Sequence, residues 1–155
     1  MEKRILSFPV HAFVPPRSSR SRRRARRVPQ EDRPLIGELE TRHRRLSIQH
    51  FDGSLPAIPI RISHRMRRRL GELTLDPVTD RPVEITISHR HIRRDGWDEV
   101  EHTLLHEMIH QWQAHTGRPV DHGPEFRRKA RAVGVVPRAM REILPRTHRS
   151  HKGFE

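Results

Sequence analysis

The segment from residue 97 to residue 115 restricts the fold of this chain more than any other stretch. At about 100° per residue, its large apolar side chains gather on one side of a helix: Leu104, Leu105, Met108, Ile109 and Trp112. His106 and His110 lie one turn apart on roughly the opposite side. We therefore predict a helix whose apolar side packs on a core and whose two histidines face a cleft.

The rest of the pattern predicts an α+β domain, in which helices pack on a small three-stranded sheet. Recurring and alternating apolar residues indicate a helix over 34–51, strands around 58–62, 73–75 and 83–87, and helices over 124–133 and 138–144. The turn-rich loop 76–82 is expected to join the last two strands as a hairpin. Asp95 is expected to cap the start of the 97–115 helix, and Gly117 to end it.

Most of the net charge of +13 lies outside this domain. Residues 1–30 hold nine Lys or Arg residues and one acidic residue, and a segment of like charges with few apolar residues cannot bury enough surface to fold. We predict a disordered Arg-rich tail over 1–30, a folded domain over 31–144 and a basic C-terminal tail over 145–155. The sequence contains no cysteine and no apolar run long enough to span a bilayer, so we expect a cytoplasmic protein without membrane association.

The sequence His106-Glu107-Met108-Ile109-His110 matches the pattern H-E-x-x-H. Two imidazoles that lie four residues apart on a helix can bind one metal ion, and imidazole nitrogens suit Zn²⁺. Glu107 follows the first histidine, where its carboxylate would lie beside a metal-bound water. The motif therefore predicts a metal site that activates water.

A third ligand is expected from beyond the helix. His122 follows the end of the helix, so the chain can turn back and bring it to His110. Glu125 is the alternative third ligand, as a carboxylate on the next helix. His102 lies too far along the helix to complete the same site, and His115 points in another direction. Three protein ligands and one position for water are typical of catalytic zinc sites, whereas structural sites have four protein ligands.

Two linked segments, Leu104-Leu105-His106-Glu107-Met108-Ile109-His110 and His122-Gly123-Pro124-Glu125-Phe126, resemble the SprT-like (SprT/Spartan) zinc metalloprotease family. The resemblance covers about residues 35–135 and implies a zincin-like minimal metalloprotease domain. It implies that the protein hydrolyses peptide bonds through a zinc-activated water, with Glu107 as the catalytic base. The zinc ligands that it implies are His106, His110 and His122.

The resemblance also implies a role for DNA, because the family includes a DNA-dependent protease that degrades proteins crosslinked to DNA. Many members carry a Cys-rich zinc ribbon, and this chain has no Cys. Basic residues of the domain could make the phosphate contacts instead, in a salt-sensitive manner that is independent of base sequence. The predicted contacts are Arg65, Arg67, Arg68, Arg69, Arg93 and Arg94. The expected partners are thus a protein substrate and DNA, and the sequence does not predict the oligomeric state.

Other interpretations remain open at this point. The chain could be a zinc-stabilised DNA-binding module without proteolytic activity, in which Glu107 would be dispensable. It could hydrolyse another class of substrate, because H-E-x-x-H specifies an activated water and not the bond that is cut. An inactive scaffold is a third alternative, which the intact Glu107 opposes. For a protein substrate, the strand at 83–88 could offer an edge on which an extended peptide adds.

Overall fold

The computed structural model describes residues 27–136. In this range the elements are helix α1 (Asp32–Phe51), strands β1 (Ile60–Ser63), β2 (Gly71–Leu75) and β3 (Pro82–Ser88), and helices α2 (His89–Asp95), α3 (Trp97–His115) and α4 (Pro124–Val133). The predicted α+β class with a small three-stranded sheet is confirmed. The expected helix over 138–144 and most of the two expected tails lie outside the described residues.

The sheet is mixed and has the strand order β1-β3-β2. β3 pairs in parallel with β1 and antiparallel with β2, which confirms the predicted hairpin. Two rows of facing residues cross the sheet: Ile60, Ile85 and Leu73 in one, and Ile62, Ile87 and Gly71 in the next. Because residues two apart in a strand face the same way, these rows form one apolar face.

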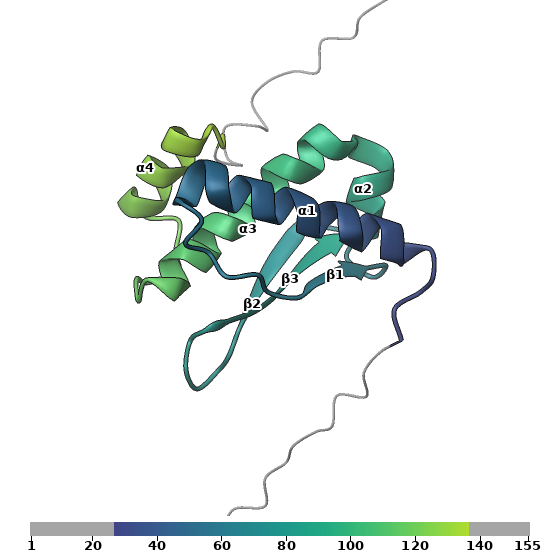
Figure 1. Ribbon diagram of the computed structural model, residues 1–155, viewed down its shortest axis with the longest axis horizontal. Helices are drawn as coiled ribbons and strands as arrows, with labels where there is room; N and C mark the ends of the chain where they lie inside the picture. The colour runs from purple at the N-terminus through teal and green to yellow at the C-terminus, as the bar shows by residue number, and fades with distance from the viewer. Residues whose placement is uncertain (1–26, 137–155) are drawn as a thin grey trace, which may run out of the picture.

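Helices α1 and α3 pack on this sheet, α1 along β1 and α3 along β3 and β2 (Figure 1). The core between the two layers is formed by buried side chains of α1, β3 and α3: Leu39, Leu46, Ile85, Ile87, Leu104, Met108 and Ile109. Helix α4 packs against α3, and α2 contacts both β3 and α3. The helix that carries H-E-x-x-H is therefore held on several sides. None of the helices within residues 27–136 combines the length and apolar character of a membrane span.

Buried polar side chains also join α1 to α3. His43 Nε2 lies 2.8 Å from Oε1 of Gln111, and Nε2 of Gln111 donates a hydrogen bond to the carbonyl of Pro56 at 2.8 Å. Burial lowers the pKa of His43, and its bond to Gln111 acts in the opposite direction. We therefore expect acid, which protonates His43, to weaken the packing of α1 on α3.

The strand around 83–88 differs from the prediction in two ways. First, β3 is the central strand and pairs on both sides, so it has no edge for a substrate; the edge strand beside α3 is β2. Second, the alternation of Val83, Ile85 and Ile87 predicts that all three are buried on one face, but Val83 is 38% exposed. A bulge between Thr74 and Leu75 pairs Leu75 with Pro82, which shifts the register at this end of β3.

Helix α2 is not predicted by the sequence pattern, because most of its residues are charged or polar. It begins after Ser88, whose hydroxyl accepts a hydrogen bond from His91 N. The prediction that Asp95 caps α3 is wrong, because its carboxylate accepts hydrogen bonds from His91 Nδ1 at 2.8 Å and Arg94 Nε at 2.9 Å. Gly96 is the N-cap residue of α3, with a φ of 80°.

Candidate metal centre

Helix α3 and the segment after it bring three imidazoles together. His106 and His110 lie one turn apart on α3. Beyond the helix, Gly117 has a φ of 71° and turns the chain. Nε2 of His122 lies 3.1 Å from Nε2 of His106 and 3.1 Å from Nε2 of His110. The structure therefore brings all three predicted zinc ligands into one group.

The three nitrogen atoms have the spacing of ligands on one metal ion. In a tetrahedral zinc site with Zn–N bonds of about 2.0–2.1 Å, two ligand nitrogens lie about 3.4 Å apart. The distances of 3.1 Å from His122 to its two neighbours are close to this value. Among residues 27–136 the group has three members, which is the number of protein ligands in catalytic zinc sites. The residues present therefore fit a catalytic zinc ion.

Gln113 fixes the orientation of one of these imidazoles. Its side chain is fully buried, and its Oε1 accepts a hydrogen bond from His110 Nδ1 at 2.9 Å. With the proton on Nδ1, the lone pair of Nε2 is directed toward the other rings. The amide nitrogen of Gln113 donates to the carbonyl of Asp121 at 3.1 Å. One side chain thus holds both His110 and the segment that carries His122.

Phe126 of α4 packs against all three imidazoles. Its ring centroid lies 4.9 Å from that of His106, 4.7 Å from that of His110 and 4.8 Å from that of His122. His110 is consequently only 8% exposed, whereas His106 is half-buried and His122 is exposed. The expectation that both histidines of α3 face a cleft is therefore wrong for His110, because α4 covers the side of α3 that the helical wheel left open.

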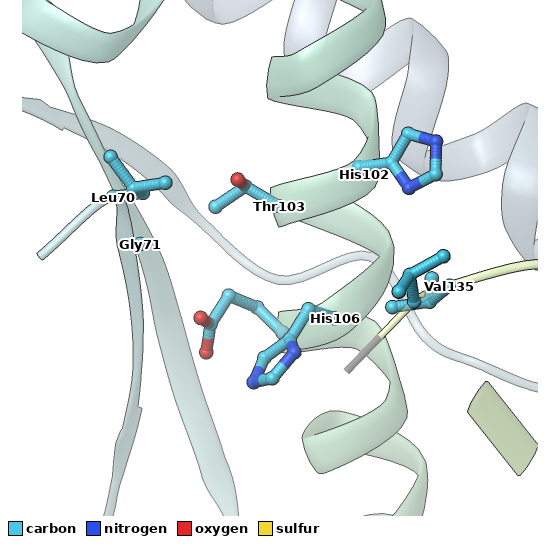
Figure 2. Close-up of a pocket in the computed structure, with 8 residues that line it drawn as sticks. Leu70, Gly71, His102, Thr103, His106 and Val135 are labelled. Carbon is cyan, nitrogen blue, oxygen red and sulfur yellow. The ribbon is translucent and has the colours of Figure 1, made fainter. Parts of the chain in front are cut away.

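Glu107 lies on the side of α3 that packs against β2, and it is 8% exposed. Gly71, the first residue of β2, is so close that a Cβ there would lie 3.2 Å from Oε1 of Glu107 and 2.8 Å from Cγ2 of Thr103. Figure 2 shows Gly71 on the strand and Thr103 and His106 on the helix, lining one pocket. Its volume of about 60 Å³ has room for only a few water molecules.

The electrostatic surroundings favour the neutral form of His110. Burial lowers its pKa, although the hydrogen bond to Gln113 acts in the opposite direction. The charge of His122 lowers it further, and Asp121 raises it. A neutral imidazole is the form that binds a metal ion. His110 is thus prepared as a ligand at neutral pH.

The structure also places the other residues that the sequence brings into question. Glu125 is outside the group, because its carboxylate accepts a hydrogen bond from Arg118 Nε at 3.0 Å. His102 lines the same pocket as His106 without joining the three histidines. Sequence reasoning misses Gln113 and Gly71. Gln113 has one usable signal, because it follows the second motif histidine by three residues and so shares a helix face with it.

The predicted DNA contacts lie on two neighbouring surface segments. Arg65, Arg67, Arg68 and Arg69 are exposed in the loop between β1 and β2, and Arg93 and Arg94 are exposed on α2. The loop lies against the start of α2, because Ser88 Oγ donates to the carbonyl of Met66 at 2.9 Å and the rings of His64 and His89 stack 4.1 Å apart. Arg69 forms an ion pair with Glu72, and Arg94 forms one with Asp95.

The domain is metalloprotease-like and has a minimal zincin-like fold. It combines a small mixed sheet with a helix that carries H-E-x-x-H and supplies two of the three clustered histidines. The family model of the SprT-like family matches residues 39–148. This match covers most of the chain, and the protein belongs to the SprT-like family, as its two motifs predict. A comparison with curated proteins found no match.

Proposed function

We propose that this protein is a zinc-dependent metallopeptidase, with Glu107 as the catalytic base and His106, His110 and His122 as the ligands. The observation that carries this proposal is the convergence of three imidazole nitrogens beside Glu107, with His122 Nε2 at 3.1 Å from both other nitrogens. Three neutral imidazoles are a donor set that suits zinc. Membership of the SprT-like family supports the same conclusion.

A bound zinc ion would lower the pKa of a coordinated water and polarise the scissile carbonyl group. In the proposed reaction Glu107 accepts a proton from the attacking water and passes it to the amine nitrogen as the C–N bond breaks. Its carboxylate is 8% exposed and shares the small pocket with His106. The hydrogen bond from Nδ1 of His110 to Gln113 keeps the proton on Nδ1, so the lone pair of Nε2 would be free to bind the zinc ion.

We propose that the substrate adds to β2 as an extended strand. Within the described sheet β2 is an edge strand, and its first residue, Gly71, packs beside Glu107. The pocket of about 60 Å³ is too small for a large substrate side chain, so the peptide would lie along the surface. Main-chain hydrogen bonds to an edge strand give affinity with little dependence on side-chain sequence.

A cleavage assay with a matched pair of variants tests the peptidase proposal. Zinc-loaded protein is incubated with unfolded casein and with a DNA-binding protein, each with and without single-stranded DNA. We expect Glu107→Gln to reduce the cleavage rate by a factor on the order of 10² to 10⁴. His115→Ala is the control, because His115 is an exposed histidine at the end of the same helix; it should leave the rate unchanged.

Equal cleavage by the wild type and Glu107→Gln would refute the proposed base. If the folded, zinc-loaded wild type cleaves neither protein under any condition, the alternative of a zinc-stabilised binding module is favoured. Cleavage that requires DNA would establish a DNA-dependent protease. Cleavage without DNA would retain the peptidase and remove the role of DNA.

We also propose that DNA binds across the loop between β1 and β2 and the adjoining α2. The exposed arginines of these two segments support it. The charge-reversed pair Arg65→Glu and Arg67→Glu should weaken binding of single-stranded DNA and reduce the slope of log K against log salt concentration. Arg131→Glu, an exposed arginine on α4, is the control, and residues 1–30 are present in every variant. Equal anisotropy titrations for both variants would exclude this surface.

A further inference from the structure

We propose a second metal site, formed by Asp32, His64 and His89. Asp32 is the first residue of α1, His64 directly follows β1, and His89 is the first residue of α2. Three separate segments of the chain therefore meet at this point. The ligand atoms of these side chains all lie within 4.8 Å of one another. The group shares no residue with the group of His106, His110 and His122.

The carboxylate of Asp32 requires a positive charge nearby. Its side chain is only 2% exposed, and a buried carboxylate is costly unless a cation or several hydrogen bonds compensate it. The amino end of α1 supplies part of this compensation. Nε2 of His64 lies 2.9 Å and 3.1 Å from the two oxygen atoms. A bound metal ion would provide further compensation.

His89 is the reason to infer a metal ion rather than an Asp–His ion pair alone. Its ring stacks on that of His64 at 4.1 Å with an interplanar angle of 24°. Two imidazoles and one carboxylate form a donor set that binds Zn²⁺, Co²⁺ or Ni²⁺. The side chain of His64 is 44% exposed, so its ring has room to tilt. A tilt would direct one nitrogen lone pair of His64 and one of His89 to the same ion.

The surroundings of this group set the expected affinity. The groove beside it is lined by Ser63, Arg65, Glu84 and Thr86, and water from this groove can complete the coordination of an ion. The cation of Arg65 disfavours a divalent ion, so we expect weaker binding here than at His106, His110 and His122. A bound ion would connect the start of α1 to the arginine-bearing loop and to α2. The site would thus hold in place the surface proposed to bind DNA.

The test uses the full chain, stripped of metal with a chelator, in the His106→Ala and His122→Ala background. This double variant lacks the first centre, so the result does not depend on whether that centre binds metal. Zn²⁺ is titrated calorimetrically, and the visible absorption of Co²⁺ reports the coordination. We expect one equivalent to bind, and we expect His89→Gln or Asp32→Asn to abolish it. His115→Gln is the control variant and should retain it.

A second readout is thermal stability, because a ligand that binds only the folded state raises Tm. Zinc should raise the Tm of the background variant but not that of the background with His89→Gln. His89 is half-buried, so its replacement decides the outcome even if Asp32→Asn unfolds α1. The proposal is overturned if the background binds no equivalent. It is also overturned if the bound equivalent survives His89→Gln.

Discussion

Replacement of Gln113 by leucine tests whether this residue positions the metal ligand His110. Leucine has a similar size but no polar atoms, so Nδ1–H of His110 and the carbonyl of Asp121 would lose their partner. The unpaired buried Nδ1–H of His110 costs about 1–3 kcal/mol. Asp121 is exposed, so water can replace the bond to its carbonyl, and we expect a loss of about 1–3 kcal/mol in the free energy of unfolding. Loss of a hydrogen bond to a ligand histidine typically lowers metal affinity about 10- to 100-fold. We therefore expect a zinc dissociation constant higher by that factor.

Gln111→Leu is the matched control. Gln111 is also fully buried on α3 and makes two hydrogen bonds, with His43 and with the carbonyl of Pro56. We expect a similar loss of stability in chemical unfolding but unchanged zinc affinity. The calorimetric titration is made in the His89→Gln background, so that a single centre is measured. An equal loss of affinity in both variants, or full affinity in Gln113→Leu, would refute the positioning role.

Three further changes have expected outcomes. Gly71→Ala should destabilise the fold by about 1–3 kcal/mol and slow catalysis, because its Cβ would come 3.2 Å from Oε1 of Glu107. Gly37→Ala is the control and should stabilise α1 by about 0.5–1 kcal/mol, because a Cβ there meets no atom within 4 Å; unfolding curves and rate assays compare the two variants. Burial lowers the pKa of His43, so below pH about 6.5 the unfolded chain binds more protons than the folded protein. Stability should therefore fall as the pH falls through this region. Unfolding midpoints at pH 7.5 and 5.5, measured in chelator, should differ less for His43→Gln than for the wild type. A hydrogen bond from Arg94, with His91 adding to it, lowers the pKa of Asp95 to about 2, so this carboxylate stabilises the fold above pH about 4 and loses its effect as the pH falls toward 2. The side chain of Arg94 is 57% exposed, so solvent screens the pair, and Asp95→Asn should cost only about 1 kcal/mol at pH 7. An unfolding free energy equal to that of the wild type would contradict this reasoning.

The long periodic elements could be predicted from sequence because their apolar residues repeat with the period of the element. The α3 prediction of 97–115 and the α4 prediction of 124–133 agree with the structure in their bounds. Helix α2 is not predicted from the sequence because it is short and polar. Its stability comes from the Ser88 cap and from contacts of His91 with Asp95 and Thr103. Contacts of this kind do not produce a periodic pattern.

The candidate site was predictable where a motif fixes spacing along a helix. His106, Glu107 and His110 follow from one segment, and His122 follows from a turn signal between two helices. The burial of His110 by Phe126 depends on how α4 packs on α3, which the sequence of α3 does not contain. The approach of Gly71 to Glu107 depends on which strand lies at the edge of the sheet. Tertiary packing, rather than local propensity, decided both features.

The most direct measurement of the central claim is anomalous diffraction at the zinc edge from crystals of the zinc-loaded protein. The account predicts a strong peak bonded to Nε2 of His106, His110 and His122 at about 2.0–2.1 Å, with water as the fourth ligand. Glu107 should lie within hydrogen-bond reach of that water. A peak elsewhere with none at these histidines, or a fourth protein ligand that closes the site, would contradict the proposal of a water-activating centre.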